Sequence, residues 1–308
     1  MQTQNSHRFQ LKLSRKSSSY ILGQCIVYLF LILLFVVTFY PFWNILVLSL
    51  NEASDSLKGG MMLWPRKLTF DSYAAVFKNQ EIFTAARLTI TRTLIGVPLA
   101  LLNTAALAYA LSRKTLPGRR WITLFFIFTM YFSGGLIPSY MVIKSLGLID
   151  NFWVFILPNL VNVFWMLLVR TYMESIPTEL EESAKLDGAG DLVIFIRIML
   201  PLSVPVLATV VLFSAVSHWN AWYDSYVYTY KPELTTLSSM LVRILNQYQT
   251  GAMQSAAAQA AAQAKRTPVS SESIRMTVTM VTTLPILMVY PLLQKYFLKG
   301  MMVGAIKA

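Results

Sequence analysis

Six long apolar runs of this chain contain no Asp, Glu, Lys or Arg, and this pattern restricts the fold more than any other feature. The runs are Ser17–Asn51, Thr93–Ser112, Trp121–Ile143, Asn151–Val169, Ile198–Tyr223 and Met276–Gln294. Each has at least 19 residues, and about 20 apolar helical residues cross the hydrocarbon core of a bilayer. Because lipid offers backbone groups no hydrogen-bond partner, each run should be helical. We therefore predict an all-α polytopic membrane protein with six transmembrane helices.

The composition supports the same fold class. Charged residues are 13% of the chain and the mean hydropathy is +0.54, whereas a soluble domain carries about 25% charged residues. This excludes a soluble enzyme. Cys25 is the single cysteine, and His7 and His218 are far apart. An internal disulfide is therefore excluded, and no metal site is predicted.

Basic residues in short loops predict the orientation. Four of them follow the second run within eight positions: Arg113, Lys114, Arg119 and Arg120. The loop after the third run has Lys144 alone. Residues 1–20 form a basic tail, and residues 299–308 end the chain with two further lysines. Both tails are therefore predicted to lie in the cytoplasm. The residues between them, 21–298, are predicted to form one six-span domain.

The sequence lacks the motifs of several function classes. No catalytic constellation is present, so no catalytic residue is predicted. No glycine precedes a lysine, so the chain has no Walker A loop and is expected to bind no cofactor itself. The apolar runs hold no ionisable carboxylate or amine, which argues against an ion-coupled transporter. A secondary or facilitative transporter remains the alternative function.

The loop between the fourth and fifth runs is predicted to form two short helices. Thr178 and Glu181 have the spacing of a capping box. Gly188 can end the first helix with a positive φ angle. Asp191 is placed to cap the second helix, which should extend to Pro201. From these residues alone, an ordinary helical hairpin remains possible.

The spacing in this loop resembles a known motif. Glu182-Ser183-Ala184 is followed after three residues by Gly188, and nine residues later by Ile198-x-Leu200-Pro201. This resembles the EAA motif of ABC importer permeases, with serine in place of its first alanine. Five other segments are similar to carbohydrate-importer permeases of the MalG-like, LplC-type branch: Ala108–Arg113, Phe132–Pro138, His218–Asn220, Tyr290–Phe297 and Lys299–Lys307.

The resemblance implies a fold, a location and a set of partners. The fold would be that of a type I importer permease (MetI-like), in the bacterial cytoplasmic (inner) membrane. The partners would be a second permease subunit, two ATPase subunits that hold ATP and Mg, and an extracytoplasmic solute-binding protein that delivers carbohydrate. No nucleic-acid partner is implied. The branch favours an oligosaccharide, with an acidic, uronic one as a possible substrate.

The same resemblance implies which residues couple the permease to its ATPase. The coupling loop would be residues 174–199. The coupling residues would be Glu182, Ser183, Ala184, Asp187, Gly188, Ile198, Leu200 and Pro201.

Six aromatic residues between positions 219 and 230 allow two interpretations. They could form an interfacial aromatic belt, or a vestibule whose rings stack on sugar faces. For the second interpretation, the substrate-path candidates are Trp219, Asn220, Trp222 and Tyr223. His218 is expected to be a packed histidine with satisfied hydrogen bonds.

The outer loop, residues 231–271, is predicted to lack an apolar core. Its Ala/Gln-rich stretch, Ala252–Ala264, contains strong helix formers. This stretch could be a docking element for the solute-binding protein or a disordered segment.

Overall fold

The computed structural model of the chain describes residues 18–56, 60, 63–253 and 270–305. Within these residues the architecture is helical, with no strand beyond one isolated bridge between Asn51 and Leu68. The long elements are α1 (Ser18–Ser49), α4 (Gln80–Ser112), α11 (Val204–Asn220), α13 (Leu237–Met253) and α15 (Ser271–Ala305). The shorter α-helices are α2 (Ala53–Ser56), α3 (Asp71–Lys78), α5 (Arg119–Tyr131), α6 (Leu136–Ser145), α7 (Val163–Glu174), α8 (Glu179–Leu186), α9 (Asp191–Ile194), α10 (Leu200–Leu202) and α12 (Tyr223–Tyr228). The 3₁₀ turns are η1 (Phe152–Phe155), η2 (Leu157–Asn159) and η4 (Pro232–Leu234), and η3 (Phe195–Met199) is a π-helix.

Two described helices are long and apolar enough to cross a membrane alone, Leu22–Ser49 and Gln80–Ser112. Three bent pairs of helices pass the same test, which makes five candidate spans if each pair is one span. The sixth predicted run lies within α15, and many side chains in the second half of α15 are outside the described residues. The count of six spans therefore stays a prediction.

The third predicted span is not one straight helix, contrary to expectation. α5 and α6 meet at an angle of 117°. The break covers residues 132–135, where Gly135 has φ 85°. This angle is costly for residues that have a Cβ atom, so the helix ends there and restarts in a new direction.

The fourth and fifth spans are also broken. The fourth begins as the 3₁₀ turns η1 and η2, which are bent by 46° from α7. In the fifth, the segment Asp191–Leu202 is bent by 78° from α11. Pro205 lies in the first turn of α11 and cannot donate a backbone hydrogen bond to the preceding turn. Proline therefore starts a new helix there instead of kinking a continuous one.

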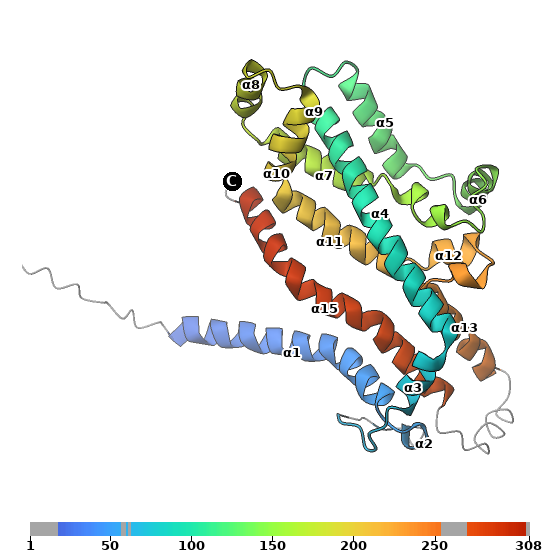
Figure 1. Cartoon of the computed structure of the whole chain (residues 1–308). Helices are drawn as coiled ribbons and strands as arrows, with labels where there is room; N and C mark the ends of the chain where they lie inside the picture. The colour runs from blue at the N-terminus through green and yellow to red at the C-terminus, as the bar shows by residue number, and fades with distance from the viewer. Residues whose placement is uncertain (1–17, 57–59, 61–62, 254–269, 306–308) are drawn as a thin grey trace, which may run out of the picture.

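α4 is the central helix of the bundle and packs against α7 and α11 (Figure 1). Its small residues Ala100, Thr104 and Ala108 are all buried, with Ala108 fully inaccessible. Small residues at four-residue spacing let helices approach closely where lipid supplies no hydrophobic drive between them. The main core cluster forms here, with Val169 and Met173 of α7 packed against the same face.

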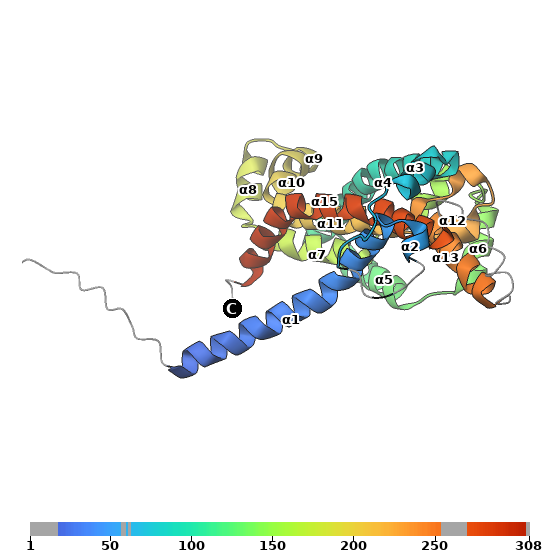
Figure 2. The same cartoon turned by 90° about the horizontal axis from the view of Figure 1, so that it is seen from below.

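α1 extends away from the other helices, as both views show (Figures 1 and 2). Its C-terminal part packs on α15. Large apolar side chains from Leu22 to Val37 are about half exposed or more. This surface is suited to lipid or to another membrane subunit. The predicted tail before α1 lies outside the described residues up to position 17, and α15 continues through most of the predicted C-terminal tail.

The outer loop contains an apolar core, contrary to the prediction. α13 begins at Leu237, which is 2% exposed and packs with Val76 of α3 and Val278 of α15. The prediction treated the segment as a whole, although its Leu and Ile residues all lie in the first half. The Ala/Gln-rich stretch lies outside the described residues from position 254 onward.

Asp150 links the connection after α6 to the end of α12. It has φ 54°, the single positive φ among described residues other than glycine. Its carboxylate accepts the backbone N–H of Tyr230 at 2.5 Å and that of Lys231 at 3.1 Å. The Tyr230 N–H is the main reason that the pKa of Asp150 lies below its ordinary value.

Candidate functional site

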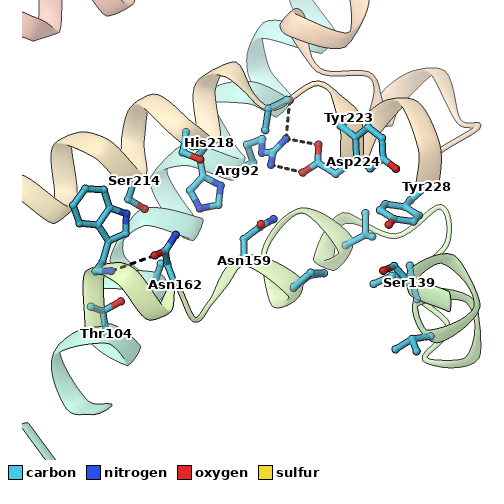
Figure 3. Close-up of a pocket in the computed structure, with 18 of the residues that line it drawn as sticks. Arg92, Thr104, Ser139, Asn159, Asn162, Ser214, His218, Tyr223, Asp224 and Tyr228 are labelled. Atoms are coloured by element: carbon cyan, nitrogen blue, oxygen red, sulfur yellow. Dashed lines mark hydrogen bonds and ion pairs between the residues drawn. The ribbon is translucent and has the colours of Figure 1, made fainter. Parts of the chain in front are cut away.

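A cavity of about 700 Å³ lies among α4, α6, α7, α11 and α12 (Figure 3). Its lining combines hydroxyl, amide and aromatic groups with one buried charge pair. The labelled side chains are Arg92, Thr104, Ser139, Asn159, Asn162, Ser214, His218, Tyr223, Asp224 and Tyr228. The volume is in the range of pockets that hold small organic ligands.

The charge pair consists of Arg92 of α4 and Asp224 of α12. The Arg92 side chain has 0% exposure, and that of Asp224 has 12%. The two nitrogen–oxygen distances are 3.1 Å and 2.5 Å, which makes the pair bidentate. Arg92 also donates to the carbonyl of Ala221 at 3.2 Å and lies 4.8 Å from the ring centre of Phe155.

This pair was not predicted from the sequence, for a definite reason. A division of the chain at its charged residues places Arg92 just outside the second apolar run. α4 in fact begins at Gln80, so Arg92 lies within the long helix. A helical pattern continuing through Arg87 and Arg92 was the available signal. Asp224 lies within the aromatic cluster in the sequence, but nothing local connects it to Arg92.

Two nitrogen atoms at the cavity are buried without a partner among the described residues. They are Nε of Arg92 and Nδ1 of His218. His218 is packed as expected, at 5% exposure, but its hydrogen-bonding capacity is not fully used. A Cβ atom at Gly96 would lie 2.6 Å from the His218 ring, so only glycine leaves room for it. Unsatisfied buried donors and acceptors are costly, and a polar ligand or water in the cavity would satisfy them.

The four substrate-path candidates do not share one location. Tyr223 lines the cavity, whereas Trp219, Asn220 and Trp222 do not. The Trp219 indole donates to the carbonyl of Thr282 in α15 at 2.9 Å. Its ring packs against the cluster formed by Val76, Leu237 and Val278. Trp222 is 39% exposed beside Tyr223, and Asn220 is exposed. Trp219 and Asn220 end α11, whereas Tyr223 begins α12 after a break at positions 221 and 222, so neighbours in sequence face different surroundings.

The second region is the short-helix loop formed by α8 and α9 at one end of the bundle (Figure 1). Gly188 has φ 82°, which confirms the predicted positive angle. The Ala189 N–H donates to the Ala184 carbonyl at 2.9 Å, and the Gly188 N–H donates to the Lys185 carbonyl at 3.0 Å. These two bonds form a Schellman motif, which ends α8 and sets the direction of α9.

The loop residues face two directions. Glu182, Ser183 and Asp187 are exposed, while Ala184 packs against the main core cluster together with Ala189. Ile198 and Leu200 also pack against that cluster, and Pro201 lies in α10 with its surface exposed. The small side chain at position 184 therefore permits close packing onto the bundle itself.

Two exposed leucines in this loop were missed by the sequence analysis. Leu186 is 89% exposed and Leu192 is 70% exposed. Leu186 precedes Gly188 in the sequence, and Leu192 follows it. The signal for Leu186 was an apolar residue at the end of the otherwise mostly polar helix α8.

Both predicted side-chain caps are wrong. Thr178 makes no capping hydrogen bond because its backbone angles are already helical, φ −70° and ψ −23°. An N-cap residue instead needs extended angles. Asp191 is the first residue of α9 rather than its cap, which is Gly190.

α4 connects the loop to the cavity. At its C-terminal end, Arg113 forms an ion pair with Glu181 of α8. The Tyr109 hydroxyl donates to the backbone carbonyl of Asp191 at 3.0 Å. The same helix carries Arg92 and Thr104 at the cavity, so one continuous helix contacts both regions. The π-helix η3 follows α9, and such segments are frequent at functional sites.

Within the described residues, no group of three or more His, Cys, Asp or Glu side chains could hold a metal ion. The polar cavity and the exposed face of the α8–α9 loop are two features that could bind a ligand or a partner protein.

The chain is similar to known proteins over most of its length. The family model described as "Binding-protein-dependent transport system inner membrane component" matches residues 70–303. The polygalacturonan/rhamnogalacturonan transport system permease protein YtcP of Bacillus subtilis (strain 168) is 34% identical over 282 residues, which are 92% of this chain and 97% of that protein. Protein LplC of the same organism is 36% identical over 276 residues, which are 88% of this chain and 90% of that protein.

A solved structure is also similar. It is a crystal structure of a bacterial ABC transporter involved in the import of the acidic polysaccharide alginate. One of its chains matches with a TM-score of 0.80 and 30% identity, covering 91% of this chain and 98% of that one. The expected importer-permease fold is confirmed. The family model spans most of the chain and the relatives match nearly end to end, so this chain belongs to the family of binding-protein-dependent transport system inner membrane components.

Proposed function

We propose that this chain is the membrane-spanning permease subunit of an ATP-driven importer of acidic oligosaccharides. The named relatives include a transporter of polygalacturonan and rhamnogalacturonan and a transporter of alginate. Both are systems for polymers rich in uronic acids. The cavity in this chain has groups suited to such a ligand.

The observation that carries the proposal is the fully buried guanidinium of Arg92 in the cavity wall. Arginine binds carboxylates with two parallel hydrogen bonds, and this geometry distinguishes a uronate from a neutral sugar. Asp224 occupies that position in the present conformation. A substrate carboxylate could compete with Asp224 for Arg92 as the cavity changes shape, while the free Nε of Arg92 and Nδ1 of His218 offer further hydrogen bonds.

The other lining groups fit a sugar. Tyr223, Tyr228 and Trp165 offer ring faces, and Asn159 and Asn162 offer amides. Rings can stack on the C–H faces of sugars while amides bind hydroxyl groups. This mixture of apolar and polar groups is typical of small-molecule sites.

The partners are those that the family resemblance implies. It has no Walker A loop, so ATP and Mg would be held by two ATPase subunits. These would dock on the exposed face of the α8–α9 loop, around Glu182, Asp187 and Leu186. A second permease subunit would complete the pathway, and a solute-binding protein would deliver the substrate. Both termini and the α8–α9 loop would lie in the cytoplasm of a bacterial cell.

Uptake by the reconstituted complex tests this proposal. Proteoliposomes would contain the full chain with its partner subunits, ATP inside, and binding protein with either an oligogalacturonate or the matching neutral oligosaccharide outside. We expect ATP-dependent uptake of the acidic ligand in preference to the neutral one. Equal uptake of both would refute the acidic specificity, and uptake without ATP would refute the importer class in favour of a facilitative transporter.

A variant pair tests the role of the cavity. Arg92→Gln should abolish uptake of the acidic ligand, whereas Arg87→Gln, an exposed position on the same helix, should leave it unchanged. Complex assembly is measured in parallel by co-purification. If Arg92→Gln assembles normally and transports normally, this guanidinium has no part in substrate passage.

A further inference from the structure

A second, smaller cavity lies where α5 begins beside the last turns of α7. Its volume is about 330 Å³, and its lining is Arg119, Arg120, Thr123, Leu124 and Arg170. Three of these five residues are arginines. α5 and α7 are in contact, so the lining comes from two helices that hold each other in place.

The cavity has a surplus of positive charge. Glu174 neutralises part of it, because this carboxylate pairs with both Arg119 and Arg170. Arg170 also donates to the Thr123 hydroxyl at 2.9 Å. Among the residues that the structure describes, Arg120 has no hydrogen-bond or ion-pair partner, and Nε of Arg119 is buried without one. Three cations against one anion leave a site that favours a negatively charged ligand.

An apolar surface continues from this cavity along α5. No residue of α5 is buried within the described chain. Trp121, Phe125 and Phe128 are 75%, 63% and 59% exposed. They follow the helical spacing of one face. Leu124 joins this surface to the cavity, at 46% exposure.

The order of these residues matches the layers of a membrane. Arg119 and Arg120 precede Trp121 directly, and tryptophan is enriched at the membrane–water interface. The phenylalanines follow one and two turns deeper. The cationic cavity therefore lies at the depth of lipid headgroups, and the apolar face lies at the depth of acyl chains.

We propose that this cavity binds the phosphate of an anionic phospholipid whose acyl chains lie along α5. Basic pockets between transmembrane helices on the cytoplasmic side bind such headgroups. A free phosphate ion would use the same arginines but would not need the apolar face. The continuous row of exposed rings favours the lipid.

Native mass spectrometry of the full chain in its purified complex tests this site. The complex is titrated with phosphatidylglycerol or with phosphatidylcholine of the same acyl chains. The key variant is Arg120→Gln, because Arg120 supports no other described contact. The matched control is Lys114→Gln, which removes one exposed charge from the same loop outside the cavity.

We expect the wild-type complex to prefer phosphatidylglycerol. One basic residue near the membrane surface contributes about a fivefold change in affinity. Arg120→Gln should therefore weaken phosphatidylglycerol binding about fivefold, and Lys114→Gln should leave it unchanged. Excess inorganic phosphate should not displace the lipid.

Four results would overturn the proposal. Equal binding of the two lipids would remove the role of charge. Equal weakening by the two variants would indicate a general attraction to the loop. An unchanged Arg120→Gln variant would exclude this cavity. Displacement by phosphate alone would indicate a site for the free ion.

Discussion

Substituting Gly188 isolates the contribution of one backbone angle to the α8–α9 loop. Gly188 has φ 82°, and a Cβ atom added there would meet no other atom within 4 Å. A substitution therefore adds no steric clash with neighbouring residues, and its cost is conformational. The left-handed conformation costs an L-residue about 1–2 kcal/mol, and less for asparagine. A β-branched residue should cost more, up to about 3 kcal/mol.

These energies predict a ranked series of effects. Because 1.4 kcal/mol is a factor of ten in an equilibrium constant, Gly188→Ala should lower the equilibrium constant that favours the observed loop conformation about tenfold. Gly188→Asn should be milder, and Gly188→Val should be the most severe. α8 would lose its Schellman motif, so the exposed face around Leu186 would point in a different direction. Membrane insertion should be unaffected, since the position lies outside every predicted span.

Gly190 provides the matched control. It has φ −75° and ψ 163°, angles that any residue adopts, and open space around its Cβ position. Gly190→Ala should therefore be nearly silent. The assay measures ATPase retained on co-purification and uptake in proteoliposomes for each variant. Equal loss in Gly188→Ala and Gly190→Ala, or full activity in Gly188→Val, would refute the reasoning.

Three other predictions test separate contacts. Asp224→Asn should lower the free energy of unfolding in detergent by about 3–5 kcal/mol, because it leaves the buried Arg92 guanidinium without its counter-charge. The unfolding temperature is the measurement, and an unchanged value would show that water in the cavity hydrates Arg92 adequately. Glu182→Lys should reduce the amount of ATPase that co-purifies. Glu179→Lys, an exposed charge reversal one turn earlier, should reduce it less. Identical losses would indicate general charge repulsion between the loop and the ATPase. The pKa of Asp150 is lowered, so its stabilising contribution is present above the ordinary value of 3.8 and is lost as pH falls through the lower folded value. Asp150→Asn should therefore unfold at a lower temperature than wild type near neutral pH, with the difference disappearing under strong acid, and a difference that persists there would contradict the charge-based explanation.

The structure shows that Glu174 is unsuitable as a control position for the coupling loop. Glu174 belongs to the same loop but precedes the motif, so sequence alone suggests that its substitution would be silent. It bridges Arg119 and Arg170 instead. Charge reversal at Glu174 should therefore disturb the junction of α5 and α7, and Glu179 is the better comparison.

Features that depend on neighbouring residues could be predicted from the sequence. Charged residues are costly in lipid, so their absence marked most of the apolar helices. Ala100, Thr104 and Ala108 share one helix face by their four-residue spacing, and all three are buried. Gly188 was assigned a positive φ because a helix had to end and turn there. The family resemblance rested on the same kind of short-range spacing.

Features that depend on distant residues required the tertiary structure. Arg92 and Asp224 are 132 positions apart, and nothing near either residue identifies the other. The inward direction of Ala184 and the contact of Trp219 with α15 depend on which helix packs beside each face. The bends in three spans depend on how broken helices repack against their neighbours. Local energies determine where helices form and end, whereas the partner of a buried charge is determined by the packing of the whole bundle.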